Sequence, residues 1–169
     1  ASYTVNLTAV NDAPILAAIG VSGTEDTTLT FTAANFTGAY TDAESTALVS
    51  ITVVTLPATG TLKLSGTNVT ASQVIVAANL PNLTYVPAAN ENGPKTFTVT
   101  VSDGVSSSST AMVTITLDPV NDAPTLTSGS TVTYLEKGAG VLIDPALTVA
   151  DVDDVSLTSA TVSITSPVT

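Results

Sequence analysis

A five-residue string occurs twice in this chain and constrains its organisation more than any other feature. Val10-Asn11-Asp12-Ala13-Pro14 returns as Val120-Asn121-Asp122-Ala123-Pro124, so that Asn11 and Asn121 lie 110 positions apart. A string that recurs at a fixed spacing indicates copies of one structural unit. A unit of about 110 residues is too long for one turn of a solenoid and has the size of an independently folding β-sandwich.

The residues that flank the two copies also correspond. Before them, residues 3–7 and 113–117 both alternate apolar and polar residues, which is the pattern of a half-buried strand. After them, Asp42-Ala43-Glu44 corresponds to Asp151-Val152-Asp153 at a spacing of 109. The sequence therefore predicts residues 1–14 as the last strand and linker of a preceding repeat, residues 15–124 as a complete repeat with its linker, and residues 125–169 as the amino-terminal part of the next repeat.

The complete repeat reads as strands throughout, and no segment keeps a helical period. Val, Ile and Thr, which favour strands, dominate runs that Gly and Pro interrupt. About seven runs with turn signals every 8–12 residues predict an all-β fold, a Greek-key β-sandwich of the cadherin or immunoglobulin type. The predicted strands are 29–32, 48–56, 61–64, 73–77, 83–86, 96–102 and 111–117, and the predicted core contains Phe31, Tyr85, Phe97, Val99 and Ile115.

Composition excludes several classes of protein. A 44% share of hydrophobic residues against 10% charged ones is unlike a disordered acidic chain, and no apolar run approaches the roughly 18 residues of a membrane-spanning helix. A net charge of −11 disfavours nucleic acid and anionic membranes as partners. The chain has no Cys, His or Arg, which disfavours zinc and copper sites and leaves no obvious general base, so we expect no enzyme.

Acidic residues gather at predicted strand ends and in the linkers, and the strand interiors of the complete repeat hold none. One interpretation is that these acids only hydrate the loops. Close carboxylates repel one another by about 1 kcal/mol at 4 Å in water and by more at lower dielectric, so a cluster favours a bound cation. Calcium takes six to eight oxygen ligands from carboxylates, amides and carbonyls, which is the donor set available here.

The same strings resemble a known family. Asp118-Pro119-Val120-Asn121-Asp122-Ala123-Pro124 resembles the linker of cadherin repeats. The whole chain is similar to the bacterial cadherin-like tandem repeats of large RTX-type biofilm adhesins, in which an E-D-T-x-L segment follows the V-N-D-A-P linker. Residues 25–29 match that segment, Asp42-x-Glu44 and Asp151-x-Asp153 match the family's D-x-D loop, and Asp103-Gly104 matches its strand-ending D-G.

The resemblance implies calcium ions at the inter-domain junctions. By this comparison the first junction uses Asn11, Asp12, Asp42, Glu44 and Asp103, and the second uses Glu25, Glu91, Asp118, Asn121, Asp122, Asp151 and Asp153. Two departures leave the number of ions per junction open. Thr8 stands where the second junction has Asp118, and the linker is one residue shorter than in cadherins.

The resemblance further implies a secreted, cell-surface role. The expected function is an extracellular structural repeat of a bacterial adhesin, stiffened by calcium between neighbouring repeats, that extends an adhesive tip whose ligand binds through other domains. Two alternatives remain open, a sandwich module that binds a glycan or a protein through its loops, and a subunit of a self-assembling extracellular filament.

Overall fold

The computed structural model describes residues 2–6, 10–129, 132–133 and 137–162. The chain divides into unit 1, Ala1–Val120, and unit 2, Asn121–Thr169. This division falls inside the second linker, four residues before the predicted end of the complete repeat. Within the described ranges, no helix has the length and apolar character needed to cross a membrane.

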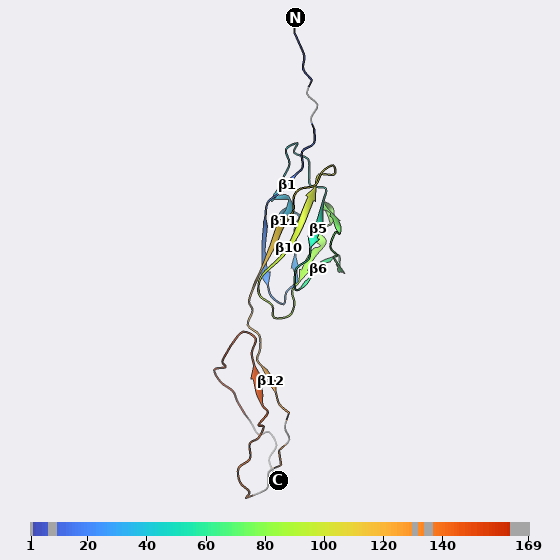
Figure 1. Ribbon diagram of the computed structural model, residues 1–169. Coiled ribbons are helices and arrows are strands. Elements are labelled where there is room, and N and C mark those ends of the chain that lie inside the picture. The colour runs from blue at the N-terminus through green and yellow to red at the C-terminus, as the bar shows by residue number, and fades with distance from the viewer. Residues whose placement is uncertain (1, 7–9, 130–131, 134–136, 163–169) are drawn as a thin grey trace. The chain divides into compact units, whose positions relative to one another are not determined.

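The described residues of unit 1 form eleven strands, which confirms the all-β sandwich. They are β1 Ile15–Leu16, β2 Ile19–Thr24, β3 Leu29–Thr30, β4 Tyr40–Thr41, β5 Ser50–Thr55, β6 Thr61–Leu64, β7 Thr67–Asn68, β8 Val74–Val76, β9 Leu83–Val86, β10 Gly93–Ser102 and β11 Ala111–Asp118. The larger sheet has the order β2-β11-β10-β5-β8, and Figure 1 labels its strands β11, β10 and β5. The smaller sheet has the order β3-β9-β6-β7, and β1 pairs with β4. The chain crosses between the two sheets at β2–β3, β5–β6, β7–β8, β8–β9 and β9–β10, as expected of a sandwich whose sheets are interleaved in sequence.

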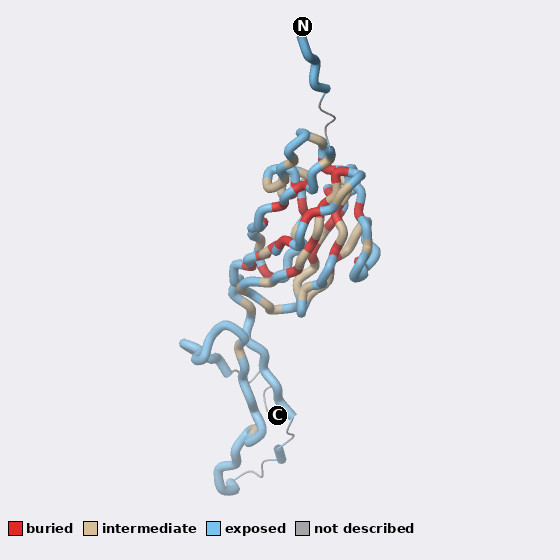
Figure 2. Tube along the Cα trace, turned by 45° about the horizontal axis from the view of Figure 1, so that its top comes forward, coloured by how far each residue is buried: buried red, intermediate tan, exposed pale blue. Residues whose placement is uncertain are grey.

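Alternation along the strands places one face of each sheet in the core. In β10, Phe97, Val99 and Val101 are buried, while the threonines between them are partly exposed. All five predicted core residues are at most 1% exposed. The Phe31 ring packs against Phe36 and Phe97 with centroids 5.8 Å apart in both pairs, the second edge to face, a geometry that adds about 0.5–1.5 kcal/mol to area burial. Figure 2 shows the buried residues concentrated in unit 1.

The structure contains two short helices that the sequence pattern did not predict. Helix α1, Ala33–Thr37, begins with a capping box in which Thr32 and Asn35 satisfy each other's backbone N–H groups. The 3₁₀ helix η1 spans Ala77–Asn82. One turn is too short to show a helical period, so the pattern could not reveal either. The prediction also missed β1, β2, β4 and β7, of which all but β2 are two residues long.

Residues 2–6 form no strand, although their alternation predicts one. Tyr3 and Val5 are highly exposed. A strand needs a neighbouring strand to satisfy its backbone groups, and no strand of the described ranges pairs with these residues. Thr8, the predicted departure at the first junction, lies outside the described residues.

The first strand pair of unit 2 has the same arrangement as the β1–β4 pair of unit 1. Strand β12, Thr125–Thr127, pairs antiparallel with β13, Thr148–Ala150. Thr125 lies opposite Ala150, just as Ile15 lies opposite Thr41 in the β1–β4 pair. No residue of unit 2 is buried within its described ranges.

Candidate metal centre

The first linker is tied to two loops of unit 1. Asn11 donates from Nδ2 to Asp103 Oδ2 at 2.8 Å and to Ser106 Oγ at 3.1 Å. The Asp12 backbone N–H donates to Glu44 Oε2 at 3.2 Å. Residues 11, 44 and 103 are far apart in sequence, and the fold brings them to one end of the sandwich. The structure thus gathers side chains that the sequence assigned to the first junction.

The Asp42-x-Glu44 segment forms a turn that follows β4. Asp42 Oδ1 accepts hydrogen bonds from the Glu44 N–H at 3.1 Å and the Thr46 N–H at 2.8 Å. Ser45 has a φ of 61°, in the left-handed region. An aspartate that satisfies the backbone ahead of it is a common way to build such a turn. The turn leaves the second carboxylate oxygen, Oδ2, unused.

Asp103 is the most strongly organised acid of this group. Its Oδ1 accepts hydrogen bonds from the N–H groups of Val105 at 2.7 Å and Ser106 at 2.6 Å. These bonds, together with the one from Asn11, hold the pKa of Asp103 below its ordinary value of 3.8. The side chain is 4% exposed. Asp103 is therefore a preformed carboxylate anion with its Oδ2 directed to the linker.

Tyr40 lies between the Asp42 turn and the Asp103 loop. The sequence pattern did not identify it as part of the site. Burial first, and then the charges of Asp42 and Asp103, raise the pKa of the Tyr40 phenol. Asp42 Oδ2 is buried, with no hydrogen bond of good geometry among the described residues. A surface cavity of about 350 Å³, lined by Asp12, Ala13, Ile15, Thr41, Asp42 and Ala43, lies beside this carboxylate. The signal in the sequence was the two-residue spacing from Tyr40 to Asp42, because side chains two positions apart in an extended segment point to the same side.

Glu25 and Asp118 mark the opposite end of unit 1. The Glu25 side chain is 1% exposed and accepts a hydrogen bond through Oε1 from the Val120 N–H at 2.6 Å. Its Oε2 has no partner among the described residues. The Glu25 N–H donates to the Asp118 carbonyl at 3.0 Å, while the Asp118 side chain is exposed. A buried carboxylate with one unsatisfied oxygen is costly unless a cation or water completes it.

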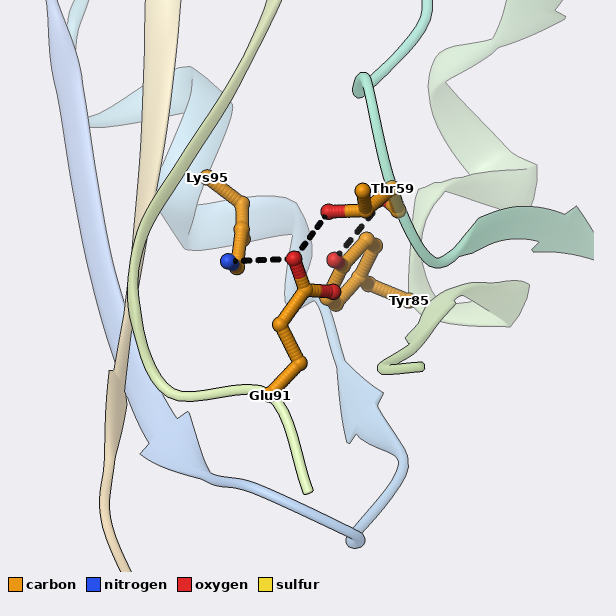
Figure 3. A network of polar contacts seen from close by, with 4 residues as sticks. All are labelled: Thr59, Tyr85, Glu91 and Lys95. Carbon is orange, nitrogen blue, oxygen red and sulfur yellow. Dashed lines mark hydrogen bonds and ion pairs between the residues drawn. The ribbon is translucent and has the colours of Figure 1, made fainter. Parts of the chain in front are cut away.

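Glu91 lies near that end but is occupied within unit 1. Its Oε1 receives hydrogen bonds from Lys95 Nζ at 2.7 Å and Thr59 Oγ1 at 2.6 Å (Figure 3). These two bonds lower the pKa of Glu91. The Tyr85 hydroxyl donates to the Thr59 carbonyl at 3.0 Å and fixes the same corner. The contacts give Glu91 a structural role, and its assignment as a metal ligand stays a prediction.

The second linker repeats the local geometry of the first. Asn121 Nδ2 donates to the Asp122 carbonyl at 2.8 Å, as Asn11 does to the Asp12 carbonyl at 2.8 Å. The Asp122 N–H donates to Asp153 Oδ2 at 2.6 Å. Asp151 Oδ1 accepts from the N–H groups of Asp153 and Asp154, both at 2.9 Å. Linker and turn therefore form one local motif, present once in each unit.

A family model described as a bacterial Ig domain matches residues 11–116, which is more than half of the chain. The chain belongs to the bacterial Ig domain family. The match begins at Asn11 of the first linker and ends within β11, so it covers the sandwich of unit 1. Comparisons with curated proteins and with solved structures give no significant match.

Bacterial Ig domains have a structural fold that is generally non-enzymatic, and they are typical of extracellular surface proteins. The polar groups of this bacterial Ig domain fit a hard cation. All the candidate donors are carboxylate, amide, hydroxyl or backbone oxygens, as calcium prefers. Asp42 Oδ2 is buried beside a cavity, and the Tyr40 phenol is the polar group that interacts with this carboxylate.

Proposed function

We propose that this chain is a structural repeat of a bacterial surface adhesin, and that calcium stiffens the junctions between its repeats. The observation that carries the proposal is the gathering of Asn11, Asp12, Asp42, Glu44 and Asp103 at one end of unit 1. A linker held to the sandwich through acids has little freedom when those acids also share a cation. The array then behaves as an extended, semi-rigid tether.

Calcium is the cation that suits this donor set. The chain offers no thiolate or imidazole ligand, because it has no Cys or His. Magnesium demands a strict octahedron and gives up its water reluctantly, which a loop-built site accommodates poorly. Extracellular modules bind calcium with a Kd of about 10⁻⁴–10⁻³ M, so such a site fills outside the cell and empties in the cytosol.

Loop recognition of a glycan has less support. Sugar sites usually offer exposed aromatic rings, whereas the rings of Phe31, Phe36, Tyr85 and Phe97 in the sandwich are buried. The exposed Tyr3 lies in the segment before the first linker, outside the sandwich loops.

The proposal is tested by thermal unfolding of the full chain with and without calcium. A site of the stated strength at about 10 mM calcium stabilises by about 1.4–2.7 kcal/mol, which raises the Tm of a domain of this size by about 5–15 °C. Magnesium at the same concentration should give a much smaller shift. Asp42→Asn should lose the calcium shift, and Asp26→Asn, an isosteric change at an exposed acid outside the predicted set, should keep it.

Solution scattering in calcium and in chelator tests the stiffening itself. The account predicts a larger and more sharply defined maximum dimension in calcium. If neither the Tm nor the scattering curve changes when calcium is added, the proposed function is overturned.

A further inference from the structure

Several asparagines of this chain stand two residues before a threonine. An N-x-S/T sequon, with any middle residue except proline, is the acceptor motif for N-linked glycosylation. The sequons are Asn6-Leu7-Thr8, Asn35-Phe36-Thr37, Asn68-Val69-Thr70 and Asn82-Leu83-Thr84. Because threonine is abundant in this chain, the strings alone do not select a site, and the surroundings of each asparagine must do so. The first sequon is set aside, since Leu7 and Thr8 lie outside the described residues.

The smaller sheet places two of the sequons on one outward face. Lys63 of β6 lies opposite Asn68 of β7 and, on its other side, opposite Thr84 of β9. Directly opposite residues of antiparallel strands point to the same face of a sheet. The middle residues of the two sequons, Val69 and Leu83, are buried in the core. Alternation therefore turns the residues on either side of them to solvent.

The threonine of each of these two sequons lies on the same face as its asparagine. Asn68, Thr70 and Asn82 are exposed, and Thr84 is half-buried. The two sequons are also neighbours, since the Ser65 N–H in the turn between β6 and β7 donates to the Asn82 carbonyl at 3.0 Å. An enzyme that recognises asparagine and threonine together can therefore reach both side chains of each sequon from one side.

The two exposed amides are not engaged within the fold. Within the described residues, neither the Asn68 nor the Asn82 side chain takes part in a hydrogen bond. Asn35 differs, because its Oδ1 accepts hydrogen bonds from the Thr32 N–H at 2.7 Å and the Thr32 hydroxyl at 2.9 Å. Those bonds belong to the capping box of α1 and hold the half-buried Asn35 in place. Asn35 is thus an internal control, a sequon whose asparagine already has a structural task.

The charge of this sheet suits the approach of a sugar donor. Sugars are activated for transfer as diphosphate esters, which carry negative charge. The whole chain has a net charge of −11, yet strands β3, β6, β7 and β9 contain no acidic residue. Lys63, which lies between the two sequons, is the charged residue of these strands. The strands beneath the sequons therefore do not repel an anionic donor.

We propose that Asn68 and Asn82 are acceptor sites for N-linked sugars on the outer face of the smaller sheet. In the transfer, Nδ2 of the asparagine attacks the anomeric carbon of a diphosphate-activated sugar. A bond forms between Nδ2 and that carbon, the bond from the carbon to the diphosphate oxygen breaks, and the diphosphate leaves with the electron pair. A base of the transferring enzyme takes the Nδ2 proton. None of the predicted calcium ligands lies on these strands, so the inference does not depend on the proposed function.

A sugar at Asn68 also protects an edge of the sandwich. Strand β7 is the outermost strand of the smaller sheet and has two residues. The unpaired backbone of an edge strand can pair with another chain, and short strands and polar groups at the edge oppose such pairing. A glycan is bulky and solubilising, so at Asn68 it keeps neighbouring copies from adding a strand to this edge.

The test uses the protein isolated from the surface of the cells that make it. Mass spectrometry of its proteolytic peptides, with fragmentation that keeps each sugar on its residue, locates the modified side chains. We expect a sugar on the peptides that contain Asn68 and Asn82, and an unmodified Asn35. Unmodified asparagine at both positions, sugar only on threonine hydroxyls, or equal occupancy of Asn35 would overturn the proposal.

Substitutions of threonine separate recognition of the sequon from simple exposure. Made in the same cells, Thr70→Ala should remove nearly all sugar from Asn68, while Thr70→Ser, which keeps the hydroxyl, should retain it. Thr67→Ala changes an exposed threonine of the same edge strand that belongs to no sequon, and it should retain the sugar too. Circular dichroism checks that each variant folds. Sugar that persists on Asn68 in Thr70→Ala, or that is lost equally in Thr67→Ala, contradicts the proposal.

Discussion

The same linker and turn occur in two very different surroundings. In unit 1, the Asp12 N–H binds Glu44 and the Asp42 carboxylate caps its turn. In unit 2, the Asp122 N–H binds Asp153 and Asp151 caps in the same way. The first copy belongs to a sandwich with a hydrophobic core. The second copy is joined to a pair of three-residue strands, and no described residue of unit 2 is buried.

The comparison separates what is local from what is not. The hydrogen bonds of the turn join residues at most four positions apart, and the short strand pair next to each linker brings linker and turn together. Both parts are present in the described residues of unit 2, none of which is buried. The Asp103 loop, which grips Asn11, comes from the far end of the sequence of unit 1 and has no counterpart in the described part of unit 2. The candidate donors around the first linker thus come partly from a local motif and partly from the folded domain.

The largest difference in stability between the units should appear when a core side chain is truncated. Phe36→Ala removes a fully buried ring that packs on Phe31. It should lower the free energy of unfolding of unit 1 by about 3–5 kcal/mol. Val149→Ala, at a half-exposed position of β13, should change stability by less than about 0.5 kcal/mol. Urea denaturation followed by circular dichroism measures both, and similar costs would mean that unit 2 has a core of its own.

A pH titration should reveal the acid that only unit 1 presents. Because the folded pKa of Asp103 is depressed, its contribution is complete above about pH 4 and is lost as the pH falls through the folded value. The Tm of the unaltered chain should therefore drop more steeply below pH 4 than that of Asp103→Asn. The variant also sets an amide nitrogen against the donor of Asn11, so it should be less stable at pH 7. Parallel Tm profiles for the two chains would contradict this reading.

The smallest effect should come from exchanging the acids of the two turns. Glu44 reaches the Asp12 N–H at 3.2 Å, whereas the shorter Asp153 reaches the Asp122 N–H at 2.6 Å. If the two turns are equivalent, Glu44→Asp and Asp153→Glu should each change stability by a few tenths of a kcal/mol, as exposed hydrogen bonds do. A change above about 1 kcal/mol in either variant, measured by Tm, would show that each turn depends on its own side-chain length.

The repeat, the strands and the core were accessible from the sequence because they leave periodic signals. The alternation of apolar and polar residues predicted that the side chains of Phe97 and Val99 point into the core. The 109-residue spacing between Asp42 and Asp151 predicted that the two segments form matching turns. Direction and partner choice leave no such signal. The parallel pairing of β2 with β11 was not predictable, and neither was the engagement of Glu91 by Lys95 and Thr59, since both depend on which strands become neighbours. Tyr40 could have been identified from its spacing to Asp42.

The central claim, that each turn and its linker contribute ligands to bound calcium, is tested most directly by calorimetric titration of calcium into the full chain. Asp42→Asn and Asp151→Asn should each weaken part of the binding at least about tenfold, or about 1.4 kcal/mol, and the double variant should lose the binding heat. Asp26→Asn and Asp154→Asn, which neutralise the same number of charges outside the predicted ligands, should titrate like the unaltered chain. Calcium uptake by the double variant equal to that of the unaltered chain would contradict the claim.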